Sequence, residues 1–408
     1  MDVFLKKSKL NSQSKIIISG SKSESNRLLL LQALYSEIDI DNLSDSDDSV
    51  VMQNALKTTD TIIDIHHAGT AMRFLTAYFA TQNKREVVLT GSQRMKERPI
   101  KILVDALTSL GANISYLENQ GCPPLKITGS ELTASKVTLK ANVSSQYISA
   151  LLLIAPSLKS GLELTLDGEI TSVPYIKMTL ALLNQVGIET TFEGQKISVK
   201  PMKEVEAKTL TVESDWSSAS YFYSLIALSD LETQITISSY KKDSLQGDSV
   251  LEDIYKHFGV ETTFNGHYIT LKKVSNPSTQ TAIQLDLANA PDIAQTISVT
   301  CFGLGIACYL TGLHTLKIKE TDRLSALKIE LEKLGAEVLI TDNSLKLAKS
   351  NTIKSNVAID TYNDHRMAMA FAPLALKTDL RVNDAAVVSK SYIAFWEHLK
   401  AVGIQISQ

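Results

Sequence analysis

The segment 103–117 (LVDALTSLGANISYL) carries the pattern that decides the fold. An amphipathic helical stretch ends at Gly111, and a short β-rich run follows it. Glycine suits the left-handed position just past a helix because it has no Cβ to clash there. The residues after Gly111 alternate or are β-branched, as in a strand. This segment therefore predicts a helix, a glycine that ends it, and a strand.

The same pattern recurs four more times, with 68–76 residues between successive glycines. The copies are LALLNQVGIETTF (180–192), LEDIYKHFGVETTF (251–264), LKIELEKLGAEVLI (327–340) and FWEHLKAVGIQI (395–406). A weaker sixth copy, DDSVVMQNALKTTDTIID (47–64), has a threonine in the place of the glycine. Six αβ units of this size would fill the chain, most naturally as two domains of three units.

The composition excludes several classes of protein. The chain has 408 residues, a formal charge of −3 and a 44% hydrophobic share, which is typical of a globular protein and excludes a disordered or fibrous chain. The near-neutral charge predicts that the protein has no nucleic-acid partner. The chain has no run of 18 apolar residues, so the sequence predicts no membrane span. The chain has three cysteines, an odd number, and they do not have the spacing of metal ligands. This favours a reducing compartment. We therefore expect a cytoplasmic protein.

Several predicted helix starts carry groups suited to anions. In GSKSESNR (20–27), Lys22 and Arg27 add positive charge to a serine-capped helix start, whose N–H groups and dipole favour an anion. Gly69 would let a ligand approach the backbone closely, and Arg98 lies in a basic loop (94–98). An ordinary capped helix with solvated cations is the alternative for each segment taken alone.

The C-terminal half holds the acid–base candidates. Asp292 follows a proline at a helix start, and the segments 319–323 (KETDR) and 363–366 (NDHR) are denser in polar groups than capping requires. The cations at these starts suit substrates with several negative charges. The chain has neither a GxxxxGK[ST] loop nor a GxGxxG motif after a strand, so nucleotide binding by those routes is not supported.

Taken in order, these motifs resemble those of the 5-enolpyruvylshikimate-3-phosphate synthases. The resemblance runs from about residue 20 to the C-terminus and rests on GSKSESNR, AGTAMR, RMKERPI, SSQ, PY, QGD, PD, KETDRL, YNDHRMAMA and a late SK. It implies an α/β fold of two similar domains, each of three βαβαββ units, an inside-out α/β barrel. The domains would be 20–213, and 1–19 plus 214–408.

The resemblance also implies a reaction and its site. The carboxyvinyl group of phosphoenolpyruvate would move to the 5-hydroxyl of shikimate 3-phosphate by addition and elimination, with no metal or cofactor. Nothing in the sequence demands more than a monomer. Asp292 would accept the hydroxyl proton, Glu320 would protonate the methylene carbon, and Lys22 would contact both substrates. The residues implied for shikimate 3-phosphate are Lys22, Ser23, Arg27, Ser144, Ser145, Gln146, Ser172, Tyr175, Asp292, Thr315 and Lys319. Those implied for phosphoenolpyruvate are Lys22, Gly69, Arg98, Gln146, Arg323, Arg366 and Lys390.

The chain departs from the family pattern at His67, Phe74 and Thr315, where asparagine, proline and asparagine are usual. We expect these departures to affect substrate affinity and glyphosate sensitivity rather than the reaction. One alternative is the related transferase that acts on UDP-N-acetylglucosamine, but the loop 91–100 lacks the reactive cysteine typical of that family. The other alternative is a non-catalytic relative, although Asp292, Glu320 and Lys22 are all present.

Overall fold

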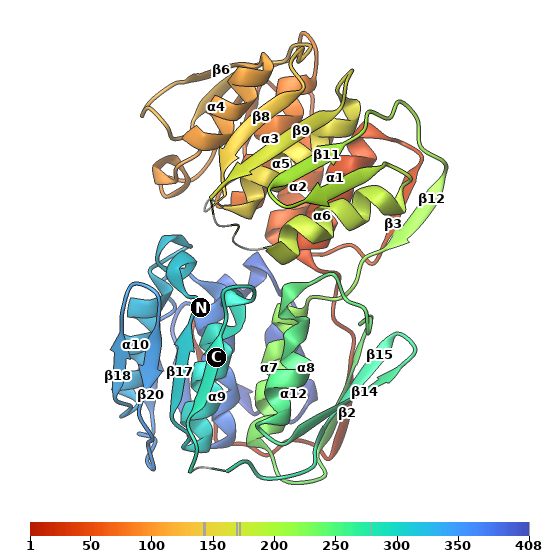
Figure 1. The fold of residues 1–408 in the computed structure, drawn as a ribbon. Helices are drawn as coiled ribbons and strands as arrows, with labels where there is room; N and C mark the ends of the chain where they lie inside the picture. Colours follow the sequence, from red (N-terminus) through yellow and green to blue (C-terminus); the bar gives the residue numbers. More distant parts are fainter. Residues whose placement is uncertain (142–143, 169, 171–172, 279, 408) are drawn as a thin grey trace. The chain divides into compact units, whose positions relative to one another are not determined.

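The computed structural model describes residues 1–408 except 142–143, 169, 171–172, 279 and 408 (Figure 1). The chain forms two compact units, which we call unit 1 (1–19 with 213–408) and unit 2 (20–212). The boundary predicted between 213 and 214 lies one residue from this division. Within the described residues, no helix is both long and apolar enough to span a membrane.

The described residues of unit 2 form two four-stranded sheets and one pair of strands, and helices alternate with these strands along the chain. Its strands are β3 (Ile38–Asp41), β4 (Ile62–Asp64), β5 (Glu86–Thr90), β6 (Asn113–Tyr116), β7 (Leu125–Thr128), β8 (Lys136–Lys140), β9 (Leu162–Asp167), β10 (Thr190–Glu193), β11 (Lys196–Val199) and β12 (Lys208–Thr211). Its α-helices are α1 (Lys22–Leu34), α2 (Asp47–Lys57), α3 (Gly69–Thr81), α4 (Lys101–Leu110), α5 (Ser145–Ile154) and α6 (Val173–Gln185).

The described residues of unit 1 form three four-stranded sheets. Its strands are β1 (Val3–Leu5), β2 (Gln13–Ile16), β13 (Gln234–Ser238), β14 (Val260–Asn265), β15 (Tyr268–Lys273), β16 (Ile283–Asp286), β17 (Cys308–Thr311), β18 (Val338–Ile340), β19 (Leu345–Leu347), β20 (Val357–Ile359), β21 (Leu380–Val382) and β22 (Ile406–Ser407). Its α-helices are α7 (Trp216–Leu228), α8 (Leu251–Lys256), α9 (Ala294–Leu304), α10 (Arg323–Lys333), α11 (His365–Phe371) and α12 (Phe395–Ala401).

The predicted helix–glycine–strand pattern is confirmed at all five strong copies. Each of the five glycines has a positive φ, between +75° and +113°, and a strand begins within three residues of it; they are Gly111, Gly187, Gly259, Gly335 and Gly403. The weaker copy also forms a helix, α2, whose last turn ends at Thr58 in extended backbone. The α/β class is therefore confirmed, and local backbone chemistry accounts for the repeat.

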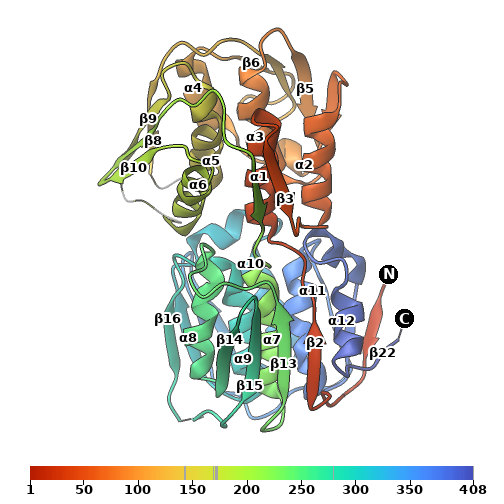
Figure 2. The same cartoon turned by 90° about the vertical axis from the view of Figure 1, so that its right-hand side faces the viewer.

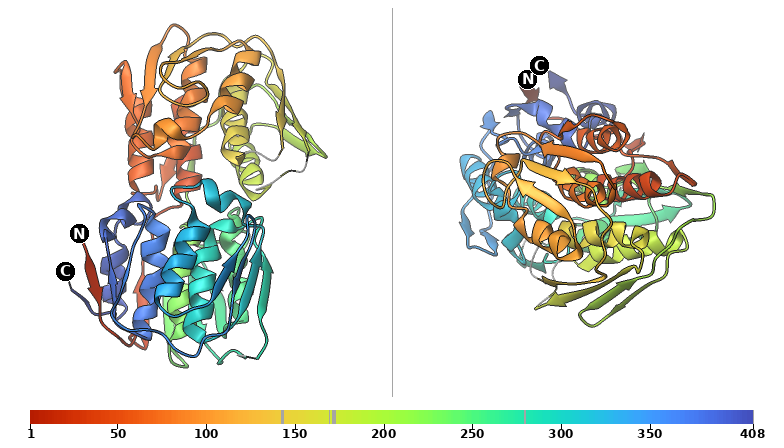
Figure 3. Two further views of the ribbon diagram at one scale, coloured as in Figure 1. Left: turned by 90° about the vertical axis from the view of Figure 1, so that its left-hand side faces the viewer. Right: turned by 90° about the horizontal axis from the view of Figure 1, so that it is seen from above.

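Segments far apart in the sequence complete three of the sheets. β2 pairs in parallel with β13, and β1 lies between β21 and β22, so the first residues of the chain finish two sheets of unit 1. The two termini consequently lie side by side (Figure 3). In unit 2, β12 pairs in parallel with β3, and this sheet has two strands among the described residues. Pairing across such separations produces no local pattern that a sequence could reveal.

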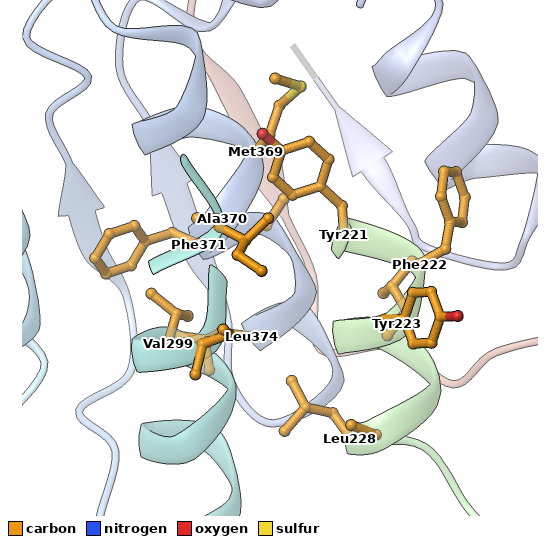
Figure 4. Packing of buried hydrophobic residues seen from close by; sticks show 14 of the residues in the cluster. Tyr221, Phe222, Tyr223, Leu228, Val299, Met369, Ala370, Phe371 and Leu374 are labelled. Carbon is orange, nitrogen blue, oxygen red and sulfur yellow. The ribbon is translucent and has the colours of Figure 1, made fainter. Parts of the chain in front are cut away.

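Two helices of unit 1, α7 and α9, are buried on nearly every side. All residues of α7 are buried, as are those of α9 up to 302, and α7, α9 and α11 run side by side inside the unit (Figure 2). Aromatic and aliphatic side chains from α7, α9 and α11, such as Tyr221, Val299 and Phe371, form the core between them (Figure 4). Because α7 and α9 are buried, their polar side chains bond to one another, as Ser220 does to Thr296, and the charged groups gather at the helix starts.

Two glycines of unit 1 give a test of backbone strain. Gly259 and Gly266 have φ of +75° and +62°, so alanine would cost about 1 kcal/mol at either position. A Cβ at 259 would also overlap the backbone oxygen of Ser275, whereas at 266 it would meet nothing within 4 Å. We expect Gly259→Ala to lower the free energy of unfolding by more than about 2 kcal/mol and Gly266→Ala by about 1 kcal/mol. Urea unfolding followed by the fluorescence of Trp216 and Trp396 measures both, and equal losses would contradict the prediction.

Candidate active site

A single guanidinium gathers three carboxylates in unit 1. Arg323 begins α10 and is 2% exposed. Its Nε donates to Asp364 Oδ2 at 2.6 Å, and its Nη1 donates to Asp292 Oδ1 at 2.8 Å. Its Nη2 donates to Glu320 Oε2 at 2.8 Å. Burial disfavours the cation, but Asp364, Glu320 and Asp292 outweigh burial and raise the pKa of Arg323. The guanidinium therefore holds the two candidate acid–base carboxylates, Asp292 and Glu320, in one arrangement.

Asp292 also contacts two further cations. It lies in the turn Pro291–Ile293 directly before α9, where the proline suits a helix start. Its Oδ2 lies 3.3 Å from Arg366 Nη2, and its Oδ1 lies 3.5 Å from Lys319 Nζ. Burial raises the pKa of Asp292, but Arg366, Lys319 and Arg323 outweigh it and hold the pKa well below its usual value. The side chain is therefore a carboxylate at neutral pH.

A second carboxylate beside Asp292 behaves in the opposite way. Asp248, in the turn Gly247–Val250, accepts a 2.5 Å hydrogen bond from Ser217 Oγ, which also accepts one from Arg366 Nη2 at 3.2 Å. Burial and the charge of Asp292 raise the pKa of Asp248 to about 7, against the opposing effect of Arg366 and the hydrogen bond from Ser217. Two neighbouring carboxyl groups thus have pKa values shifted in opposite directions.

The raised pKa of Asp248 predicts a pH-dependent stability effect. The folded protein binds a proton on Asp248 more tightly than the unfolded chain does. The contribution of Asp248 to the free energy of unfolding therefore falls as the pH rises from about 4 to about 7. Asp248→Asn removes that loss. We therefore expect the variant to gain free energy of unfolding over the parent chain at pH 8, and to gain much less at pH 5. Urea titrations monitored by Trp216 and Trp396 at both pH values measure it; the same difference at both would contradict the assignment.

The other sequence-predicted residues of unit 1 lie near this cluster. Lys390, at the end of the turn Ala385–Lys390, donates to the backbone oxygen of Asn363 at 2.7 Å, next to Asp364. The Thr315 hydroxyl is buried and has no hydrogen-bond partner among the described residues. Asp364 caps α11 by accepting from Arg366 N at 2.9 Å, which aligns the arginine with Asp292.

In unit 2, Lys22 and His67 share one carboxylate. Lys22 begins α1, and its Nζ lies 3.3 Å from Asp48 Oδ2. The other oxygen, Asp48 Oδ1, lies 3.8 Å from His67 Nε2. The Asp48 side chain is 8% exposed at the start of α2. Three helix-start segments are therefore joined by a buried carboxylate between two groups that can carry positive charge.

The start of α3 has the features of an anion site. The Arg98 guanidinium lies directly over Gly69, because a Cβ on Gly69 would come within 2.5 Å of Arg98 Nη1. Gln146 Nε2, from α5, donates to Thr70 Oγ1 at 3.0 Å. A side chain at position 69 would push the Arg98 guanidinium away, so glycine lets the helix N-terminus, a guanidinium and an amide meet there.

Arg27 is buried rather than directed to solvent. Its Nε donates to Thr179 Oγ1 at 2.8 Å, and its Nη2 donates to Ser149 Oγ at 3.0 Å. Burial lowers the pKa of Arg27 to about 10, against the opposing effects of Tyr175 and Glu24. Its guanidinium also lies 5.5 Å from the centre of the Phe74 ring, a cation–π distance, so Phe74 covers this cation.

The remaining predicted residues of unit 2 belong to these same helix starts. Arg27 Nη1 donates to the backbone oxygen of Ser23 at 2.6 Å and its Nη2 to that of Tyr175 at 3.4 Å. Ser144 caps α5 by accepting from Gln146 N at 3.4 Å, and Ser145 is the buried first residue of that helix. Ser172 lies outside the described residues.

Three carboxylates of the two clusters had no role assigned from the sequence. Asp48 sits in SDSDD (44–48) and Asp364 in NDHR, where helix capping explains an aspartate equally well. Asp248 lies in the QGD motif, which was noticed for its resemblance but without a chemical role. The signal that separates them from ordinary caps is burial beside a cation, which a single sequence does not display.

The chain is similar in sequence to known proteins over nearly its whole length. Residues 53–399 match the family model described as EPSP synthase (3-phosphoshikimate 1-carboxyvinyltransferase). A 3-phosphoshikimate 1-carboxyvinyltransferase from Bacteroides fragilis is 46% identical over 396 residues, covering 96% of this chain and 95% of its own. One from Colwellia psychrerythraea is 37% identical over 418 residues, covering 95% and 96%.

Solved structures are similar in fold. An EPSP synthase from Acinetobacter baumannii aligns over 100% of both chains with a TM-score of 0.81 and 20% identity. The enolpyruvyl transferase NikO from Streptomyces tendae aligns over 100% of this chain and 98% of its own, with a TM-score of 0.75 and 15% identity. The expected architecture of this fold family is thereby confirmed.

Proposed function

The chain belongs to the family of EPSP synthases, the 3-phosphoshikimate 1-carboxyvinyltransferases, and from this premise we propose how its charged helix starts carry out the reaction. The enzyme transfers the carboxyvinyl group of phosphoenolpyruvate to the 5-hydroxyl of shikimate 3-phosphate and releases phosphate, a step of the shikimate pathway of aromatic amino-acid biosynthesis. The observation that carries the assignment of roles is the buried Arg323 guanidinium, which bonds to both Asp292 and Glu320.

Asp292 is the proton acceptor for the 5-hydroxyl. When it takes that proton, the hydroxyl oxygen forms a bond to the second carbon of phosphoenolpyruvate, and Glu320 gives a proton to the methylene carbon. The tetrahedral intermediate then returns a methyl proton to the Glu320 carboxylate and expels phosphate, which takes the proton held on Asp292, and the carbon–carbon double bond is restored. Each carboxyl group thus acts once in each direction, as general acid–base catalysis by addition and elimination requires.

The cations around Asp292 explain why this carboxylate becomes a strong enough base only when the substrates are bound. Without substrate, Arg366, Lys319 and Arg323 hold the pKa of Asp292 far below the range of a useful base. Lys319 and Arg366 are also the cations assigned to the anionic substrates, whose negative charges oppose the cationic field at Asp292. Substrate binding therefore raises the pKa of Asp292 and makes it a stronger base when the hydroxyl is in place.

The charged and polar side chains at the helix starts supply the contacts with the two anionic substrates. Phosphoenolpyruvate is held by Arg366, Arg323, Lys390, Gly69, Arg98 and Gln146. Lys22 contacts both substrates. Shikimate 3-phosphate is held by Lys319, Ser23, Ser144, Ser145, Ser172, Tyr175 and Thr315. Gln146 and Asp292 also contact this substrate. Arg27 supports this second group through its bonds to Ser23 and Tyr175. The Gly69 helix start with Arg98 over it is well suited to a phosphate or carboxylate.

A phosphate-release assay tests the function. Purified protein mixed with shikimate 3-phosphate and phosphoenolpyruvate, in buffer to which no metal is added, should release inorganic phosphate and form a product heavier by the carboxyvinyl group in a mass spectrum. The control replaces shikimate 3-phosphate with UDP-N-acetylglucosamine. Phosphate release only in that control would assign the chain to the sugar-nucleotide transferases, and release in neither mixture would favour a non-catalytic relative.

We further propose that the enzyme is a cytoplasmic monomer. Its three cysteines, Cys122, Cys301 and Cys308, are free thiols, as expected in a reducing compartment. A single chain also contains every residue assigned to the two substrates. Light scattering on the purified protein should give a mass close to 44.7 kDa, and twice that mass would contradict the monomer.

A further inference from the structure

His67 lies beside the anion site at the start of α3. It lies two residues before Gly69, in the turn that leads into α3, and its side chain is 38% exposed. Its Nε2 lies 3.8 Å from Asp48 Oδ1, while Lys22 Nζ lies 3.3 Å from the other oxygen of the same carboxylate. Lys22 and His67 therefore share one negative charge whenever the imidazole is protonated.

Several neighbouring elements contribute charged groups to the surroundings of His67. α2 contributes Asp48, which is buried, and α1 contributes Lys22. The loop before α4 contributes Arg98, whose guanidinium lies over Gly69. The turn itself contributes His66, whose Nδ1 lies 3.8 Å from Asp64 Oδ1 at an exposed position. Asp48 is thus the buried anion of this group, and it lowers the positive potential that Lys22 and Arg98 offer a substrate.

We propose that His67 is a positioning residue for anion binding in unit 2, and that its protonated form strengthens binding by neutralising Asp48. The inference rests on the proposed function, because it takes Lys22 and Gly69 as contacts of phosphoenolpyruvate. When the imidazole is protonated, it takes up part of the charge of Asp48, and the Lys22 ammonium is left to the substrate. When the imidazole is neutral, Asp48 holds Lys22 more strongly, and the local field at the start of α3 loses one positive charge.

The sign of the pH effect follows from ordinary histidine chemistry. Histidine is the side chain whose charge ordinarily changes near neutral pH, so the test covers pH 6 to 8. Within that range the KM for phosphoenolpyruvate should rise with pH because of His67. One unit charge about 4 Å away in a water-like dielectric changes binding by about fivefold. Phosphate esters also titrate near pH 6, but that change affects every variant alike.

The test compares four proteins over pH 6 to 8: the parent chain, His67→Asn, His67→Lys and the matched control His66→Asn. His66 is the sequence neighbour and has the same separation from an aspartate, but that aspartate is exposed rather than buried. The measurements are KM for phosphoenolpyruvate and kcat at each pH. We expect His67→Asn to have an about fivefold higher KM than the control at pH 6 and an equal one at pH 8, with kcat within twofold throughout.

The lysine variant separates charge from packing. His67→Lys should keep a low KM at pH 8, because its ammonium stays protonated, whereas a merely structural role would not be rescued in this way. Identical pH profiles for His67→Asn and His66→Asn would overturn the inference. Failure of the parent chain to release phosphate from the two substrates would instead overturn the proposed function, so the two failures are distinguishable.

Discussion

Replacing Asp292 with asparagine should lower kcat by about 10²–10⁴, the usual contribution of a general base. Asparagine has the size of aspartate and keeps an oxygen that can accept from Arg323, but it cannot take the proton of the 5-hydroxyl. It also leaves Arg366 and Lys319 without the carboxylate that they contact at 3.3 and 3.5 Å. Steady-state phosphate release with both substrates at saturation measures the effect.

The matched control for this variant is Asp230→Asn. Asp230 is also an aspartate of unit 1 in contact with an ammonium, since Lys9 Nζ lies 2.7 Å from it, but the pair is exposed. We expect the control to retain the parental kcat. Unfolding curves followed by Trp216 and Trp396 check that both variants are folded. A kcat of Asp292→Asn within threefold of the control would show that this carboxylate is not the base.

Replacing Arg323 with methionine should produce the largest loss of stability. Methionine fills a similar volume without charge, so Asp292, Glu320 and Asp364 would lose the cation that bonds to all three. Removing one partner of a buried ion pair typically costs about 3–5 kcal/mol, because the other charge stays buried and uncompensated. We expect a loss of that size in the free energy of unfolding of unit 1 at pH 7.5.

The loss should shrink as the pH falls. Carboxylates without the guanidinium have raised pKa values in the folded variant, so folding takes up protons and the variant gains stability relative to the parent toward pH 5. The control is Arg381→Met, which removes an exposed arginine from its pair with Asp2 and should cost less than about 1 kcal/mol. Equal losses for Arg323→Met and Arg381→Met would contradict the central role of Arg323.

Much of the fold could be predicted because its signals are local. Gly111, Gly187 and Gly259 each follow an amphipathic stretch, and each adopts the positive φ that such a position favours. The candidate residues could also be located on helix starts, since α1, α3 and α10 begin at Lys22, Gly69 and Arg323. Capping and hydrophobic periodicity act within a few residues of chain, and a single sequence therefore displays them.

The strand pairings that close the sheets could not be predicted. β2 and β12 join partners more than 150 residues away, and neither strand carries a pattern that names its partner. The sequence also offered no reason to connect Asp48 with both Lys22 and His67, because an aspartate at a helix start is common. Distance in space, not spacing in the chain, decides these contacts.

The sequence by itself determined the repeated αβ unit, the class of reaction and the helix starts that carry the charged residues. Only the tertiary structure decided how those charges act on one another: that one guanidinium bonds to Asp292, Glu320 and Asp364, and that Asp248 and Asp292 have pKa values shifted in opposite directions. The physical reason is that Coulomb interaction and desolvation depend on separations of a few ångströms and on burial. Both quantities arise when segments distant in the chain pack together.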